Sequence, residues 1–206
     1  MDGITIEADD VIVDGFRSVR PEAPGIELTG HRVTVRNNTV IGPRGGDGDG
    51  IRFFGDDLAI AHNTVRGTDN GHGRHADCMQ TFASDTPPSH RVRIENNRCE
   101  DIDNMCLMAE GPGEGDGHGT TGDFTIRGNH CETLRASQAL MFEDVRNATI
   151  TGNEFATPTH HAIGLALRST GARVDGNTLH PGIRYEVGID ASSRPGYRGP
   201  EPGGLP

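Results

Sequence analysis

Six asparagines recur at the same place in a repeated phrase, and they constrain the fold of this 206-residue chain more than any other feature. They are Asn38, Asn63, Asn97, Asn129, Asn153 and Asn177, spaced 25, 34, 32, 24 and 24 residues apart. Apolar residues alternate before each of them. A period of this length with alternation before a turn residue predicts a β-solenoid, whose coils stack about 4.8 Å apart. Equal positions then form columns, and an inward asparagine column can pass hydrogen bonds along the axis as a ladder.

The repeated phrase also carries a family resemblance. VTVRNNTVIG (33–42), followed by GIRF (50–53), resembles the repeat of right-handed parallel β-helix proteins, the pectate-lyase-like superfamily. The resemblance extends from Gly3 to Ala191 and implies an all-β, single-domain right-handed parallel β-helix of about seven coils with an internal Asn ladder. We expect residues 1–191 to form this domain. Residues 192–206 would be a Gly/Pro-rich tail, either disordered or laid along the solenoid.

Charge and length limit the partners and the location of the chain. A net charge of −11 argues against nucleic acid or an anionic membrane as partner. No apolar run is long enough for a transmembrane helix, and no signal peptide follows Met1. We therefore expect an extracellular or periplasmic protein if a signal peptide was removed, and otherwise a cytoplasmic one. The helix that usually plugs the N-terminal end of such solenoids is missing, so either the sequence is trimmed or a partner chain or second copy covers that end.

The four cysteines do not have the spacing of a disulfide framework. Cys99 and Cys131 each follow a ladder asparagine by two residues, in a column otherwise filled by apolar side chains. We predict stacked, buried thiols that act as small hydrophobic groups. A disulfide between Cys99 and Cys131 is the alternative for an exported protein.

The extra length of the coils gathers over the middle of the solenoid. A second strand is expected in every coil, and the connections around it lengthen at Arg66–Ala76, Ala83–His90 and Glu110–Gly122. Long loops on a rigid scaffold are where binding and catalytic residues collect. The sequence therefore predicts a functional site on the middle coils.

The densest group of polar side chains in this region is in GRHADCMQTF (73–82). In the aligned coils Asp77 stacks over Asp49 and His75 over Asp47, and Asn104 continues the aspartate column. One strand spacing separates the Asp49 and Asp77 carboxylates by about 5 Å, which suits the acid and nucleophile of a retaining glycosidase. We predict His75, Asp77 and Asp49 as catalytic residues. The alternative is that these residues only cap turns.

Neighbouring outward positions supply the predicted substrate contacts. Arg52 and Gln80 share one outward column, with Glu27 before them and Leu107 after them. Arg52 either binds a substrate carboxylate or pairs with Glu27. The remaining predicted substrate-binding residues are Asp103, Asn104 and His72. No cofactor is expected, although Asp47, Asp49 and Asp77 offer the oxygen ligands that Ca²⁺ accepts.

Three functions fit this pattern. The first is a carbohydrate-active enzyme, a polysaccharide lyase or glycoside hydrolase that cleaves a glycosidic bond of a polysaccharide or oligosaccharide on the face of the middle coils. The second is a non-catalytic glycan-binding or structural module, and the third a small-molecule cyclase or isomerase. An open groove with a His/Asp cluster favours the first, a polar face without such a cluster the second, and a deep pocket the third. Aromatic residues are scarce, and of these Phe54 and Phe82 are placed to stack on a sugar.

Overall fold

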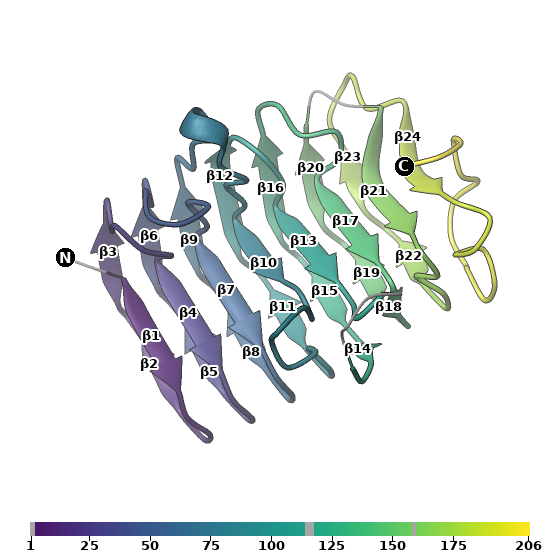
Figure 1. The fold of residues 1–206 in the computed structure, drawn as a ribbon. Helices are drawn as coiled ribbons and strands as arrows, with labels where there is room; N and C mark the ends of the chain where they lie inside the picture. The colour runs from purple at the N-terminus through teal and green to yellow at the C-terminus, as the bar shows by residue number, and fades with distance from the viewer. Residues whose placement is uncertain (1–2, 114–117, 158–159) are drawn as a thin grey trace.

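The computed structural model describes residues 3–113, 118–157 and 160–206, which form one stack of parallel coils (Figure 1). Three long parallel sheets, A, B and C, run along the stack, and each coil contributes one strand to each sheet. Sheet A contains β1 (Ile4–Glu7), β4 (Ile26–Thr29), β7 (Ile51–Phe54), β10 (Met79–Thr81), β13 (Leu107–Glu110), β17 (Leu140–Glu143), β21 (His161–Ala166) and β24 (Tyr185–Ile189). The chain is therefore the predicted all-β right-handed parallel β-helix of about seven coils.

Sheets B and C have seven strands each. Sheet B contains β2 (Ile12–Asp14), β5 (Thr34–Arg36), β8 (Ala59–Ala61), β11 (Arg93–Glu95), β15 (Thr125–Arg127), β19 (Thr149–Thr151) and β22 (Arg173–Asp175). Sheet C contains β3 (Arg17–Val19), β6 (Thr39–Ile41), β9 (Thr64–Arg66), β12 (Arg98–Ile102), β16 (His130–Thr133), β20 (Glu154–Ala156) and β23 (Thr178–Leu179). A short pair, β14 (Thr121–Gly122) and β18 (Val145–Arg146), and one 3₁₀ turn, η1 (Gly71–Gly73), complete the described elements.

Each repeated phrase spans a corner between sheets B and C. The residue before the ladder asparagine has a left-handed backbone, with φ of 55° at Asn37, 54° at Asn96 and 65° at Gly128. Asparagine and glycine adopt this conformation at low cost, which explains their recurrence at that place. The expectation of two strands per coil was wrong because this corner divides the phrase into two short strands in different sheets.

The six asparagines lie one above another inside the corner. The Nδ2 of each donates to the Oδ1 of the next, at 2.9 Å from Asn38 to Asn63 and 3.0 Å from Asn63 to Asn97. The same bonds join Asn97 to Asn129, Asn129 to Asn153 and Asn153 to Asn177. Each Nδ2 also donates to a sheet B carbonyl, so buried amides are paired along the whole column.

Inward side chains of the three sheets form one continuous apolar core. In sheet A the column is Ile26, Ile51, Met79, Leu107, Leu140, Ile163 and Val187, all at most 2% exposed. Leu107 therefore points inward, and the predicted place of Leu107 after Gln80 on the outer face was wrong by one residue. The residue in register with Gln80 is Met108.

The cysteines differ from the prediction as well. Cys78 and Cys99 form a disulfide with a Cα–Cα distance of 5.8 Å, whereas Cys106 and Cys131 are buried free thiols. The expectation of a buried free thiol was wrong for Cys99 and is met by Cys131, and the alternative bond between Cys99 and Cys131 was wrong. The reason is that Cys78 turns inward at the corner before β10, where it meets Cys99 within its own coil.

The tail is laid along the last coil. Gly203 N donates to Val187 O at 2.8 Å, and Ile189 N donates to Gly204 O at 2.7 Å. A Cβ at Gly188 would lie 2.9 Å from Pro206 Cα, so the glycine makes room for the chain end on the outer face of sheet A. The tail closes the C-terminal end of the stack, as the yellow loops in Figure 1 show.

At the opposite end the first coil leaves Ile12 62% exposed and Val19 38% exposed. A partner chain or second copy over these side chains stays a prediction. None of the helical segments in the described ranges has the length and hydrophobicity to cross a bilayer.

Candidate functional site

The outer face of sheet A over the middle coils presents two stacked columns of side chains. The first is Glu27, Arg52, Gln80, Met108, Met141, Gly164 and Gly188. The second pairs Thr29 with Phe54, and Glu110 with Glu143 and Ala166. Because a rigid parallel sheet holds both columns, their relative positions are fixed by the fold rather than by loop conformation.

At the edge of this face lies a group we call the His75 cluster: Asp49, Arg52, His75, Asp77 and Asn104. Asp77 is fully buried, just before β10, and its Oδ1 accepts bonds from Asn104 Nδ2 and Met105 N, both at 2.8 Å. Its Oδ2 lies 3.1 Å from Nδ1 of His75, whose side chain is 48% exposed. The cluster therefore joins a buried carboxylate to a solvent-facing imidazole.

The second nitrogen of His75 lies at the open edge of the cluster. Nε2 is 2.9 Å from Asn104 Nδ2, the same amide nitrogen that bonds Asp77 Oδ1. With the Nδ1 proton directed at Asp77, Nε2 carries the lone pair. If a substrate hydroxyl or water takes the place of the Asn104 amide at Nε2, Asn104 still keeps its hydrogen bond to Asp77 Oδ1. This geometry allows His75 to accept a proton from a group outside the protein.

Asp49 supports the cluster from the preceding coil. It is fully buried; its Oδ1 accepts Asp77 N at 2.9 Å and its Oδ2 accepts Arg52 Nε at 2.6 Å. Arg52 Nη2 also donates to Asp47 Oδ2 at 2.8 Å. Asp49 thus fixes the backbone that carries Asp77. Arg52 pairs with Asp47 and Asp49 rather than with Glu27.

Burial dominates the electrostatics of the two aspartates. It raises the pKa of Asp49 to about 6, although Arg52 opposes the shift. Burial also raises the pKa of Asp77, against the opposing effect of His75. In turn the Asp77 carboxylate, 3.1 Å from Nδ1, raises the pKa of His75 above its ordinary value. Neither aspartate reaches solvent: Asp77 contacts His75, and Asp49 contacts the backbone of Asp77. Their predicted catalytic roles stay a prediction.

Two buried acceptors in this region lack a hydrogen bond. They are Asp77 Oδ2, whose contact with His75 Nδ1 is an ion pair outside hydrogen-bond geometry, and Gln80 Oε1 on the outer column. Gln80 is 7% exposed. Buried polar atoms without partners are rare in proteins and call for an explanation. At a binding site, one explanation is that a donor group of the ligand supplies the missing hydrogen bond.

Two predicted site residues lie outside the cluster. Asp103 accepts Asn70 N at 2.9 Å, and its backbone N donates to Thr68 Oγ1 at 3.0 Å, so it holds the 67–76 loop. His72 is exposed in η1 with φ of 66°. The structure brings the remaining predicted residues together, and Arg52 also lies 5.8 Å from the Phe82 ring, which packs edge-on against Phe54 at 4.9 Å.

The sequence analysis missed two outward carboxylates, Glu110 and Glu143. They are in register on neighbouring strands and half-buried. Burial raises the pKa of Glu110, with Glu143 adding to the shift, and its charge interacts with His75 and Asp77. The sequence does contain a sign of this pair, because Met-Ala-Glu (108–110) and Met-Phe-Glu (141–143) occupy equivalent positions in successive coils. Since the predicted strand at Leu107 was shifted by one residue, Glu110 was assigned to the following loop.

The calcium site at Asp47, Asp49 and Asp77 stays a prediction, although the Arg52 guanidinium already supplies positive charge between the first two. Within the described ranges, the potential metal ligands whose atoms all lie within 4.8 Å of one another are the sulfurs of Cys99, Cys106 and Cys131. One of these is in a disulfide.

The Asp77–His75 contact gives a direct prediction for the histidine. Replacing Asp77 with Asn removes the carboxylate that favours the imidazolium, so the pKa of His75 should fall toward its ordinary value of about 6.5. NMR titration of the imidazole, with the signal assigned from the His75→Ala spectrum, measures this shift. The matched control is Asp103→Asn, which should leave the titration of His75 unchanged. An unmoved or raised pKa in Asp77→Asn would contradict the contact.

Comparison with known proteins places the chain in a family. The family described as "Right handed beta helix region" matches residues 2–179, and the chain belongs to it. Among curated proteins there is no match.

One solved structure supports the fold. An alginate lyase from Paenibacillus sp. str. FPU-7 superposes with a TM-score of 0.50 at 13% identity, over 91% of this chain and 75% of the lyase. Full-length QnrB1, a plasmid-mediated fluoroquinolone resistance protein, covers 90% of this chain and 94% of its own at 10% identity and a TM-score of 0.21. At these identities the likeness concerns the fold alone.

Proposed function

We propose that this protein is a carbohydrate-active enzyme that cleaves a glycosidic bond on the outer face of sheet A. The observation that carries the proposal is the contact between solvent-facing His75 and buried Asp77 at 3.1 Å, beside the stacked outward columns. A carboxylate behind a histidine fixes its tautomer and raises its basicity, as in hydrolytic triads. His75 then serves as the general base through Nε2.

The paired glutamates supply the second group that cleavage needs. Adjacent strands place Glu110 and Glu143 about 5 Å apart, and burial together with the neighbouring Glu143 charge raises the pKa of Glu110. A carboxylic acid there can protonate the leaving oxygen while His75 activates water. Asp77, Asp49 and Asn104 hold His75 in place. Gln80 lies beside Arg52 on the outward column, and its buried Oε1 has no hydrogen bond within the protein until the side chain turns to a sugar hydroxyl.

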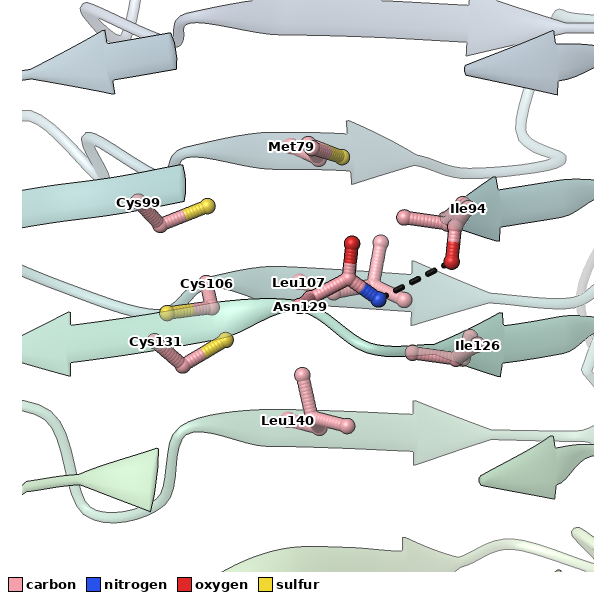
Figure 2. Close-up of a pocket in the computed structure, with 9 residues that line it drawn as sticks. All are labelled: Met79, Ile94, Cys99, Cys106, Leu107, Ile126, Asn129, Cys131 and Leu140. Atoms are coloured by element: carbon pink, nitrogen blue, oxygen red, sulfur yellow. Dashed lines mark hydrogen bonds between the residues drawn. The ribbon is translucent and has the colours of Figure 1, made fainter. Parts of the chain in front are cut away.

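An extended substrate suits the shape of this surface. The cavity drawn in Figure 2 measures about 10 Å³ and lies in the apolar core, so it has no room for a sugar. Larger hollows of about 340, 620 and 350 Å³ lie on other parts of the surface, and His75 lines none of them. The open part of the surface beside His75 is the stretch over Glu27 and Arg52, which are partly exposed, and an extended chain can lie across these coils. This favours a polysaccharide or oligosaccharide over a small molecule of a cyclase or isomerase.

The charges around the cluster favour hydrolysis of a neutral or amino-substituted glycan. Arg52 is already shared by Asp47 and Asp49, and Glu110 and Glu143 add negative charge. Elimination from a uronate needs a cation to neutralise the substrate carboxylate, and this surface would instead repel it. The alginate lyase shares the fold, and alginate belongs in the test as the anionic alternative.

The test is a product assay on neutral, amino-substituted and uronate-containing polysaccharides. New reducing ends without unsaturated products are expected from neutral or amino-substituted chains. Gln80→Ala should raise KM about tenfold, because it removes the amide beside Arg52 that would bond a sugar hydroxyl. Tm is measured alongside, since the Gln80 side chain is 7% exposed. Unsaturated products from uronates would replace hydrolysis by elimination, and binding without any product would indicate a glycan-binding module.

A further inference from the structure

The four cysteines occupy equivalent places in two successive coils. Cys99 is in register with Cys131, and Met79 with Leu107, which places Cys78 directly above Cys106. The pair Cys78–Cys99 bridges the start of sheet A to sheet C across the core of one coil. Cys106 and Cys131 form the same pair one coil further on, and both are 2% exposed. Figure 2 shows Cys106 just before β13 and Cys131 on β16, with Cys99 on the neighbouring coil.

Other coils show how closely these two positions approach each other. At the place of Cys78 the preceding coils have Gly25 and Gly50, where a Cβ would lie 2.3 Å from Val40 and Val65 respectively. Small residues also occupy this place later, in Ala139 and Ala162. The two columns therefore touch in every coil, and a cysteine in both columns brings two sulfurs together.

We propose that Cys106 and Cys131 are the site of a second disulfide, so that the oxidised protein carries two stacked cross-links between sheets A and C. The sulfurs of Cys106 and Cys131 already lie within 4.8 Å of each other. Since the first pair closes with a Cα–Cα distance of 5.8 Å, in the usual range for disulfides, the repeated backbone offers the same geometry to the second pair.

The reaction balances with a small-molecule disulfide such as oxidised glutathione as the oxidant. The two protein S–H bonds and the glutathione S–S bond break, the Cys106–Cys131 bond forms, and two glutathione thiols are released. Two electrons pass from the cysteines to glutathione. Burial raises the pKa of the Cys106 thiol, so few thiolates exist in the folded state, and oxidation should occur while the coils are still open.

The surroundings favour a covalent bond over a metal. Apart from Asn129 and the cysteines, the lining of the adjacent cavity is aliphatic or thioether: Met79, Ile94, Leu107, Ile126 and Leu140. Figure 2 shows Asn129 turned to Ile94 O, to which its Nδ2 donates at 2.9 Å. Thiolates around a metal need hydrogen-bond donors to offset their charge, whereas a disulfide is neutral and suits an apolar core.

The second cross-link would also support the His75 cluster. Asp77 precedes Cys78, and Met105, whose N donates to Asp77 Oδ1, precedes Cys106. Two cross-links would therefore tie both segments of the Asp77–Met105 contact, one before Cys78 and the other before Cys106, to sheet C. The proposal does not depend on the proposed function, because its readouts are covalent structure and stability.

The test is disulfide mapping of protein refolded with reduced and oxidised glutathione. Free thiols are alkylated in denaturant, and digestion with trypsin and Asp-N then separates the four cysteines, because Asp101 and Asp103 lie between Cys99 and Cys106. We expect two linked pairs, Cys78–Cys99 and Cys106–Cys131, and no alkylated cysteine. Alkylated Cys106 and Cys131 beside an intact first pair, a Cys99–Cys131 bond, or stoichiometric bound zinc would each overturn the proposal.

A stability measurement gives an independent check. Cys106→Ala with Cys131→Val copies residue types found at these positions in other coils, so the core should still close. This variant should lose about 5–12 °C in Tm relative to oxidised wild type, as expected for removal of one disulfide. Under reducing conditions the difference in Tm between this variant and wild type should become smaller. Equal Tm values of the oxidised proteins would overturn the proposal.

Discussion

His75→Ala should lower kcat/KM on the glycan that the enzyme cleaves by about 10²- to 10⁴-fold, the usual loss when a general base is removed. His75 is the solvent-facing member of its cluster, whereas Asp77 and Asp49 are fully buried. Because the lost group is the proton acceptor, kcat should fall far more than KM changes. Initial rates of reducing-end formation with saturating and limiting substrate measure both constants.

The control for this variant is a histidine away from the cluster. His62→Ala removes an exposed histidine at the corner between sheets B and C and should keep wild-type activity. Since the His75 side chain is 48% exposed, added imidazole can reach its place and should restore part of the rate in His75→Ala. Wild-type activity should rise with pH through the raised pKa of His75, because only the neutral imidazole accepts a proton. A His75→Ala enzyme with undiminished kcat would remove His75 from the mechanism.

The fold could be predicted because its main signals are local and repeated. A left-handed corner residue followed by a buried asparagine recurs in every phrase, and stacking then follows from the period. The number of strands per coil was not predictable from the alternation of apolar and polar residues, because the corner between sheets B and C interrupts that alternation for only two residues. Each short strand is defined by pairing with the coils above and below, which the sequence of one coil does not contain.

The site was predictable where polar side chains stood out against an apolar background. Asp49, Asp77 and His75 did so, and the structure brings them together. The run from Met105 to Met108 gave no alternation, because Met105 and Met108 are buried outside the main core against Ala136 and Met141. The resulting shift of one residue hid Glu110 and Glu143. The disulfide was missed for a related reason, since Cys78 and Met79 both point inward at the corner.

Asn97→Ala should destabilise the protein by about 3–5 kcal/mol, the largest stability effect expected for one side chain of the column. Asn97 Oδ1 accepts Asn63 N at 2.9 Å and Asn63 Nδ2 at 3.0 Å. Its own Nδ2 donates to Ile60 O at 2.8 Å and to Asn129 Oδ1 at 3.0 Å. Alanine would leave these groups buried in an apolar core without partners, where each costs about 1–3 kcal/mol.

Two variants separate this effect from a general sensitivity of the corner. Asn96→Gly changes the exposed neighbour, whose φ of 54° glycine adopts readily, as Gly128 does in the next coil. It should cost less than about 1 kcal/mol. Asn177→Ala removes the last member of the column, which is partly exposed, so water can replace its bonds and the loss should be smaller than in Asn97→Ala. Urea denaturation of the three variants measures the order. If Asn97→Ala costs no more than Asn177→Ala, the asparagine column does not hold the middle coils together, and the rigid placement of the His75 cluster must come from the apolar core and the cross-linked cysteines instead.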